Sequence, residues 1–110
     1  MQLTVSDTGA HLVITVNEPR IDAAIATRFR DKLRDIVIKH RKPVEIEMRA
    51  VDFMDSSGLG AMIALRKVLP DGMPMILRGL TPNVERVFRL TRMDTVFDIR
   101  PLTESEEQRE

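Results

Sequence analysis

The sequence predicts one α/β domain: a mixed, mostly parallel sheet of four to five strands with helices mainly on one face. The chain has 110 residues, which suits a single domain. Its segments alternate in the order β-β-α-β-α-β-α-β, as expected for helical crossovers between parallel strands. The expected strand Val44–Met48 alternates apolar and acidic residues, which predicts one wet face of the sheet.

The first two strands are expected to form a hairpin. Leu3 and Val5 belong to the first strand, and the apolar run Leu12–Val16 forms the second. Turn-forming residues lie between them at Asp7–Ala10, which favours an antiparallel first pair. The segment Asn17–Arg20 then breaks the strand.

A first helix is expected after Asp22, whose side chain is suited to cap a helix start. An apolar stripe recurs at helical spacing through Ile25, Phe29, Leu33, Ile36 and Val37. The basic run Lys39–Lys42 complements the dipole at the end of this helix, and Pro43 stops it. We interpret the run as helix-end chemistry, because it is short and lacks the aromatic residues of a nucleic-acid patch.

The remaining elements follow from similar patterns. Thr81-Pro82 predicts a helix opening, with a hydroxyl cap followed by proline at the first helical position. The expected domain covers residues 1–102, and the charged segment 103–110 is expected to be a solvated tail. The other expected elements are a helix over Gly58–Leu69, a strand over Met73–Leu77 and a last short strand over Val96–Ile99.

Composition excludes several classes of function. Lysine plus arginine and aspartate plus glutamate both number 17, so the balanced charge argues against nucleic-acid or membrane partners. The chain has no cysteine, which excludes disulfides, thiolate catalysis and cysteine-bound metal. No apolar run is long enough to span a bilayer and no secretory signal opens the chain, so a cytoplasmic location is expected. No cofactor or metal is expected.

The most informative segment is Phe53–Gly60, where Ser56 and Ser57 follow Asp55 and precede two glycines. This pattern predicts a serine hydroxyl at the exposed N-terminus of a helix, flanked by residues too small to cover it. A hydroxyl in that position has three possible roles: helix cap, enzyme nucleophile or phosphate acceptor.

Each role requires different surroundings. A capping serine accepts a hydrogen bond from a free backbone N–H, worth about 1 kcal/mol. A nucleophilic serine needs a base, but His11 is expected in the hairpin and His40 in the basic helix end, and no G-x-S-x-G pattern occurs. A phosphate is tolerated at a helix N-terminus and adds about −1.5 to −2 charges, which would disturb any partner pressed against it.

The glycines of this segment have two interpretations. Gly58 and Gly60 either ease packing of the helix on the sheet or leave a bare surface that a partner's backbone approaches. They do not form a phosphate-binding loop, because the lysine and the spacing of that motif are missing.

The segment Phe53–Gly60 resembles the signature of the STAS family, and within it that of the bacterial anti-sigma factor antagonists. The resemblance covers about residues 3 to 100. Ile21–Ala24 is similar to the family's loop and helix start, and Thr81–Phe88 to its third helix. The serine motif is the most specific of these segments.

The resemblance implies a non-enzymatic switch in which Ser56 accepts a phosphate. The expected partners are an anti-sigma factor that is also an ATP-using serine kinase, and a PP2C-type phosphatase that reverses the modification. The unphosphorylated form would bind the kinase and free the sigma factor. The implied contact residues are Asp22, Asp55, Ser57, Gly58, Leu59 and Gly60.

The chain also departs from the family pattern near the expected partner surface. Pro19-Arg20 stands where many relatives carry glycine and an acidic residue, and Thr91–Met93 replaces a common serine-glycine. The alternative role is a STAS subunit or sensor module of a transporter or signalling assembly. A nucleotide-binding or hydrolysing enzyme is a weaker third hypothesis, motivated only by the glycine-rich turn. Net neutrality permits a dimer without requiring one.

Overall fold

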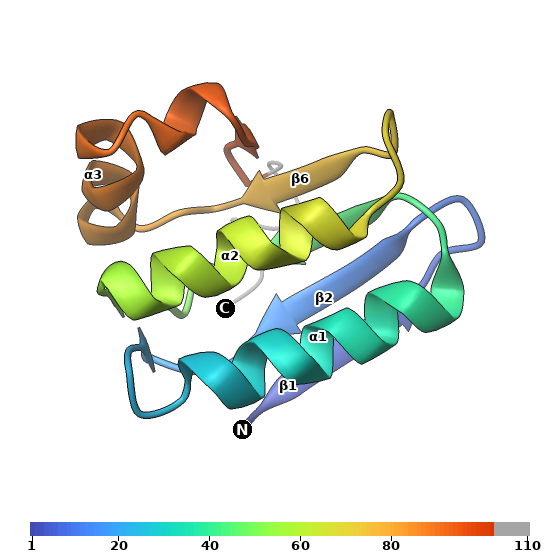
Figure 1. Cartoon of the computed structure of the whole chain (residues 1–110), viewed down its shortest axis with the longest axis horizontal. Coiled ribbons are helices and arrows are strands. Elements are labelled where there is room, and N and C mark those ends of the chain that lie inside the picture. Colours follow the sequence, from blue (N-terminus) through green and yellow to red (C-terminus); the bar gives the residue numbers. More distant parts are fainter. Residues whose placement is uncertain (103–110) are drawn as a thin grey trace.

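The computed structural model describes residues 1–102, and the tail expected at 103–110 lies outside them (Figure 1). It begins with the predicted hairpin, in which β1 (Leu3–Asp7) pairs antiparallel with β2 (Leu12–Val16). Gly9 turns the chain with φ +91°, a conformation open to glycine because it lacks a Cβ atom. Its N–H donates to Asp7 Oδ1 over 2.8 Å.

The rest of the main sheet is parallel to β2. Its strand order is β1, β2, β4 (Val44–Glu47), β6 (Met75–Arg78) and β7 (Asp98–Arg100), and only the first pair is antiparallel. Three helices connect the strands, and this mixed five-stranded sheet confirms the predicted fold class. The elements are α1 (Ala26–His40), β4 (Val44–Glu47), α2 (Ser56–Val68), β6 (Met75–Arg78), α3 (Pro82–Leu90), the 3₁₀ turn η1 (Met93–Thr95) and β7 (Asp98–Arg100).

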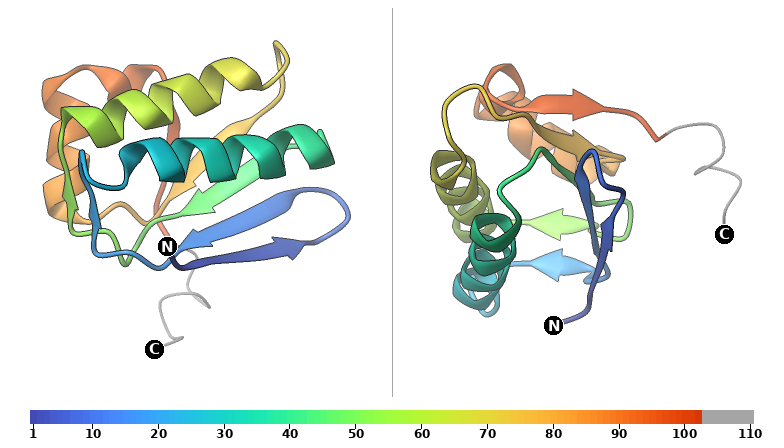
Figure 2. Two further views of the ribbon diagram at one scale, coloured as in Figure 1. Left: turned by 60° about the horizontal axis from the view of Figure 1, so that its bottom comes forward. Right: turned by 90° about the vertical axis from the view of Figure 1, so that its right-hand side faces the viewer.

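Helices α1 and α2 lie side by side on one face of the sheet, as predicted (Figure 2). Apolar residues of both helices are fully buried against the strands, which is why each helix shows one apolar stripe in the sequence. The largest buried side chains of this layer are Phe29 and Leu33 of α1, Met62 and Leu65 of α2, and Ile14, Ile46 and Leu77 of the sheet.

Helix α3 lies near the N-terminal end of α2 and packs against η1 (Figure 1). The Thr81 hydroxyl accepts from Val84 N over 3.5 Å and donates to the Val51 carbonyl over 2.8 Å, which confirms the predicted cap. The rings of Phe88 and Phe97 meet edge to face, with centroids 5.5 Å apart. This aromatic pair ties α3 to the segment that leads into β7.

The structure adds a small second sheet that sequence patterns did not predict. β3 (Arg20–Ile21) pairs in parallel with β5 (Phe53–Met54). Two-residue strands show no alternation that could be read from sequence. Their pairing brings together the two loops on which the candidate site is built.

Several predicted boundaries were wrong by two to four residues, the usual error at element ends. Helix α1 begins at Ala26 rather than just after Asp22, and α2 begins at Ser56 rather than Gly58. Strands β6 and β7 each begin two residues later than predicted. The prediction that one face of β4 is exposed to solvent is also only partly correct. Glu47 is 5% exposed, and it accepts from Arg49 N over 3.0 Å.

Candidate functional site

The β3–β5 pairing places two acidic loops side by side. Ile21 lies opposite Met54 in register, so Asp22 and Asp55 leave the two strands next to each other. The backbone N–H of Ala23 donates to Asp55 Oδ2 over 3.2 Å. The loop before α1 is therefore joined directly to the start of α2.

Asp55 is also the N-terminal cap of α2. Its Oδ1 accepts from Gly58 N over 3.0 Å, and its backbone is extended, as is typical of a cap residue. One carboxylate thus holds the helix start with one oxygen and the neighbouring loop with the other. The hypothesis that a serine caps this helix is wrong, because the carboxylate one position earlier does so.

Ser56 and Ser57 are the first two residues of α2, and both are exposed. Neither hydroxyl forms a hydrogen bond with any of the residues that the structure describes. The side chains therefore lie at the positive end of the helix dipole with their oxygens accessible. This is the placement that the sequence motif predicted.

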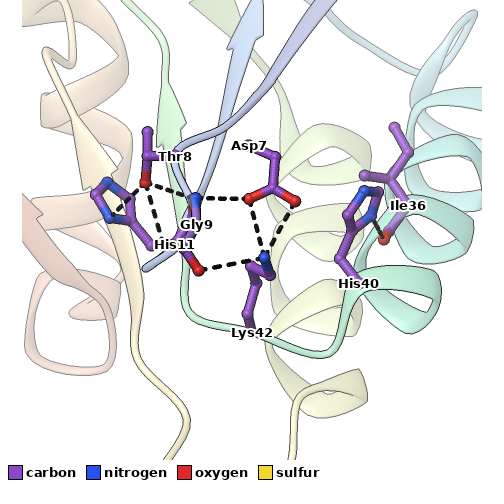
Figure 3. Close-up of polar contacts among 7 residues, drawn as sticks. All are labelled: Asp7, Thr8, Gly9, His11, Ile36, His40 and Lys42. Carbon is purple, nitrogen blue, oxygen red and sulfur yellow. Dashed lines mark hydrogen bonds and ion pairs between the residues drawn. The ribbon is translucent and has the colours of Figure 1, made fainter.

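The two histidines lie far from these hydroxyls in the fold. His11 precedes β2 and His40 ends α1, at the end of the molecule where the parallel strands begin, whereas α2 starts at the opposite end (Figure 1). Figure 3 shows the His11 ring beside the Thr8 hydroxyl, 3.3 Å away, and His40 Nδ1 2.8 Å from the Ile36 carbonyl. The described residues therefore offer the serines no histidine base.

The two glycines of α2 have different surroundings. A Cβ atom on Gly58 would overlap the Ile21 carbonyl oxygen and lie 2.8 Å from Met54 Cγ. Gly58 therefore permits close packing of the helix start on β3. A Cβ atom on Gly60 would meet nothing within 4 Å, so this glycine has no packing reason inside the chain. The packing interpretation therefore applies to Gly58, and Gly60 lies on a bare part of the helix surface.

A shallow groove runs between the first turns of α1 and α2. Its volume is about 280 Å³, and it opens beside the serine pair. Small side chains form most of its lining, which consists of Ala23, Ala26, Thr27, Arg30, Ser57, Gly60 and Ala61. Such a surface lets another protein approach the helix backbone closely.

Asp22 lies at the rim of the site with its side chain 27% exposed. It does not cap α1, whose N-cap residue is Ile25 without a side-chain bond. Its Oδ1 instead accepts from Ala24 N over 3.1 Å, and its carbonyl accepts from Ala26 N over 2.8 Å. Asp22 thus shapes a turn that precedes the helix, which corrects the predicted helix start.

The expected contact residues differ in accessibility. Gly60 and Ser57 are exposed, and Asp22 and Asp55 are partly exposed. Gly58 is buried, and Leu59 is only 8% exposed. These last two residues support the start of α2 from beneath and offer little surface of their own.

The structure adds residues to the site that sequence reasoning missed. The Arg20 guanidinium lies over the Phe53 ring, 4.1 Å from its centroid, and Arg20 Nε is 3.4 Å from Asp22 Oδ2. Asn83 of α3 donates to Asp52 Oδ1 over 3.4 Å, which links α3 to the same loop. The departure Pro19-Arg20 was noticed in the sequence, but the contact depends on the β3–β5 pairing.

The part of the chain that the structure describes holds no cluster of three or more histidine, aspartate or glutamate side chains arranged to bind a metal. No helix within the same residues is long and apolar enough to cross a membrane.

Comparison with known proteins identifies the family. The STAS domain profile matches residues 2–108. An anti-sigma-B factor antagonist of Listeria monocytogenes is 28% identical over 81 residues, 73% of this chain and 71% of that protein.

Solved structures share the fold. An anti-sigma factor antagonist from Mycobacterium paratuberculosis superposes with a TM-score of 0.84 at 23% identity, over 94% of this chain and 88% of that one. The Bacillus cell fate determinant SpoIIAA, solved in its phosphorylated form, gives 0.65 at 21% identity over 96% of both chains. With a profile match over nearly its whole length and this shared fold, the chain belongs to the STAS domain family.

Proposed function

We propose that this STAS domain is an anti-sigma factor antagonist, a non-catalytic binding protein that phosphate on Ser56 switches off. The observation that carries the proposal is the exposed Ser56 hydroxyl at the first position of α2, free of hydrogen bonds to the described residues. Because Asp55 already caps the helix, Ser56 has no structural task that modification would disturb.

The names of the relatives support this role. The similar Listeria protein is named an anti-sigma-B factor antagonist, and SpoIIAA is described as an anti-sigma factor antagonist in its unphosphorylated form. SpoIIAA has also been solved in a phosphorylated form. The serine motif of this chain lies on the same fold, so we extend the role to it.

The charge balance of the site explains how a phosphate would act. A phosphate on Ser56 adds about −1.5 to −2 charges beside Asp55 and Asp22. The helix dipole favours an anion at this position, so the fold tolerates the modification. A partner that covers the site would instead bury an unpaired charge, at a cost of about 2–5 kcal/mol. That cost corresponds to a loss of affinity of roughly thirty- to several-thousand-fold.

The proposed docking surface consists of the exposed groups around the serine. Asp22, Asp55 and Ser57 supply polar contacts, and Gly60 leaves the helix backbone bare beside the groove. Gly58 and Leu59 act from beneath by fixing the position of this surface. Glycine in a helix interior costs roughly 0.5–1 kcal/mol relative to alanine, so a bare Gly60 fits an intermolecular role.

A phosphorylation switch requires one protein that adds the phosphate and another that removes it. The binding partner is an anti-sigma factor that is also a serine kinase and uses ATP, and a PP2C-type phosphatase restores the binding-competent form. The kinase step needs ATP, the phosphatase step needs only water, and we place both enzymes and this protein in the cytoplasm. The chain itself supplies the acceptor oxygen and the docking surface, and no catalytic group.

The test requires the cognate kinase and a chain with phosphoserine installed at position 56 during synthesis. We expect kinase and ATP to modify Ser56 alone, as mapped by mass spectrometry, and phosphoserine to weaken kinase binding at least thirtyfold, about 2 kcal/mol, by calorimetry. Ser57→Ala is the comparison variant: it removes a polar contact of the docking surface, so it should weaken kinase binding while Ser56 remains the residue that is modified.

Two outcomes would contradict the proposal. One is an unmodified Ser56 in the presence of active kinase. The other is equal kinase affinity for the phosphorylated and unphosphorylated chains. Either result would favour the other role considered for this fold, a STAS subunit of a larger assembly. Ser56→Asp is a weaker substitute for phosphoserine, because it adds only one charge on a shorter side chain.

A further inference from the structure

Strand β1 exposes a complete set of backbone hydrogen-bonding groups at the edge of the sheet. Asn17 N donates to the Gln2 carbonyl over 2.9 Å, and Thr8 N to the His11 carbonyl over 3.0 Å. Hydrogen-bonded pairs alternate along an antiparallel ladder, so Thr4 and Ser6 direct their backbone groups toward β2. The N–H and C=O groups of Leu3, Val5 and Asp7 therefore point away from the sheet.

This edge lacks the usual protection of an outer strand. β1 is five residues long, it contains no lysine and no proline, and no other strand within residues 1–102 pairs with its outer side. Natural edges are commonly blocked by such residues, by bulges or by shortness. The opposite edge strand, β7, follows that rule, because it has three residues and exposes Asp98 and Arg100.

The one charge on β1 is neutralised within the chain. Lys42 Nζ lies 2.9 Å and 3.1 Å from the two oxygens of Asp7, and it also donates to the Gly9 carbonyl over 3.3 Å (Figure 3). The hydrogen bond from Lys42, helped by the one from Gly9 N, holds the pKa of the Asp7 carboxyl below its ordinary value. A second copy approaching this edge therefore meets no unpaired charge.

The side chains along the edge also suit a symmetric contact. On the helix-covered side, Val5 is 42% exposed and Leu3 is only partly buried. On the other side the strand carries the hydroxyls of Thr4 and Ser6. If two such strands pair antiparallel with Val5 on the two-fold axis, Val5 lies opposite Val5, each Thr4 lies opposite Ser6, and each Leu3 lies opposite the Asp7 carboxylate that Lys42 neutralises. Threonine–serine pairs are favourable across strands, and the two valines bury apolar surface against each other.

We propose that two copies of this chain pair antiparallel through β1 about a two-fold axis at Val5, which makes one continuous sheet from both copies. An isologous interface requires a surface that complements itself, and this strand meets the requirement in its hydroxyls and its backbone hydrogen-bonding groups, with no unpaired charge to oppose the contact. A foreign strand with charged residues would find no opposite charge here. The contact uses none of the residues assigned to the Ser56 surface.

Val5→Pro provides a direct test. Proline removes one backbone donor, and the Val5 donor points outward, so the β1–β2 ladder keeps its hydrogen bonds. We expect the unmodified chain to sediment as a dimer of the 12.6 kDa protomer and Val5→Pro to weaken the dimer at least about tenfold. Val5→Thr is the matched control, because it keeps both the N–H and the β-branched shape and should dimerise normally.

Hydrogen exchange on the unmodified chain gives an independent measurement that does not depend on a variant folding. The amides of Val5 and Asp7 should exchange more slowly as protein concentration rises, whereas those of Thr4 and Ser6 should be protected at every concentration. A chain that stays monomeric at about 1 mM would overturn the proposal. So would a dimer whose Val5 and Asp7 amides exchange independently of concentration, because that dimer uses another surface.

Discussion

The effect of a substitution depends on the atoms next to the residue. Gly58 and Gly60, which lie within one helical turn, show this contrast. Replacing Gly58 by alanine places a methyl group against the Ile21 carbonyl and Met54, so we expect a loss of about 1–3 kcal/mol in unfolding free energy. Gly60→Ala, where nothing lies within 4 Å, should stabilise the chain by about 0.5–1 kcal/mol. Urea unfolding of both variants measures the contrast. Equal effects of the two substitutions would contradict this account of the helix start.

The Asp7–Lys42 pair predicts how stability depends on acid. The Lys42 ammonium and Gly9 N–H hold the pKa of Asp7 below its ordinary value of 3.8 in the folded chain. A lowered folded pKa stabilises the protein above the unfolded value, and this contribution is lost as pH falls through the folded one. Asp7→Asn should therefore lower stability at pH 7 and flatten the acid limb of the curve. Lys42→Met should do the same, as followed by thermal unfolding from pH 7 to pH 2.

Arg92 has φ +63° and lies directly ahead of η1. The left-handed conformation costs a residue with a Cβ atom roughly 1–2 kcal/mol. Arg92→Gly relieves that cost but loosens the unfolded chain, so we expect a net gain of about 0.5–1 kcal/mol. Differential scanning calorimetry would show it as a higher midpoint. A lower midpoint would mean that the arginine side chain contributes more than its backbone costs.

The serine motif was the part of the site that sequence could predict. Ser56 and Ser57 were expected at an exposed helix start because small residues follow them, and the structure places them there. The stack of Arg20 on Phe53 could not be predicted, because 33 positions separate the residues and only a two-residue strand pairing joins them. The sequence left a serine cap open as one of three roles and did not identify Asp55 as the cap, because serine and aspartate are equally good caps.

At the scale of elements, the segment from α3 to β7 depends on one aromatic contact. Phe97 is 4% exposed and meets Phe88 edge to face, whereas its neighbour Val96 is 45% exposed. Phe97→Ala should cost about 3–5 kcal/mol, because it leaves a cavity between α3 and β7. Val96→Ala should change stability by less than about 0.5 kcal/mol. Guanidinium titration of the two variants separates a packing effect from a general sensitivity of this segment.

Long elements of this fold could be predicted from sequence more accurately than short ones. The apolar stripe from Ile25 to Val37 follows most of the fifteen-residue helix α1 and therefore identifies it, although its first turn was placed too early. β7 was expected two residues early because Val96 and Phe97 look strand-like, yet both belong to the turn after η1. Short elements take their limits from tertiary contacts, which local sequence does not contain.

At the scale of the whole molecule, the docking surface and the β1 edge draw on separate residues. The first lies at the start of α2, and the second runs along the outer strand (Figure 1). Ser56→Asp should therefore leave the dimerisation constant unchanged while it weakens kinase binding. Analytical ultracentrifugation of Ser56→Asp and Val5→Pro tests whether the two surfaces act independently. A dimer that dissociates on Ser56→Asp would show that the two surfaces are coupled.

The double use of Asp55 has a consequence for redesign. One carboxylate fixes both the loop before α1 and the first turn of α2, so neither segment can be exchanged alone without shifting the other. A chimera that borrows its partner preference from a relative should therefore transplant both segments as a unit, with the aspartate between them.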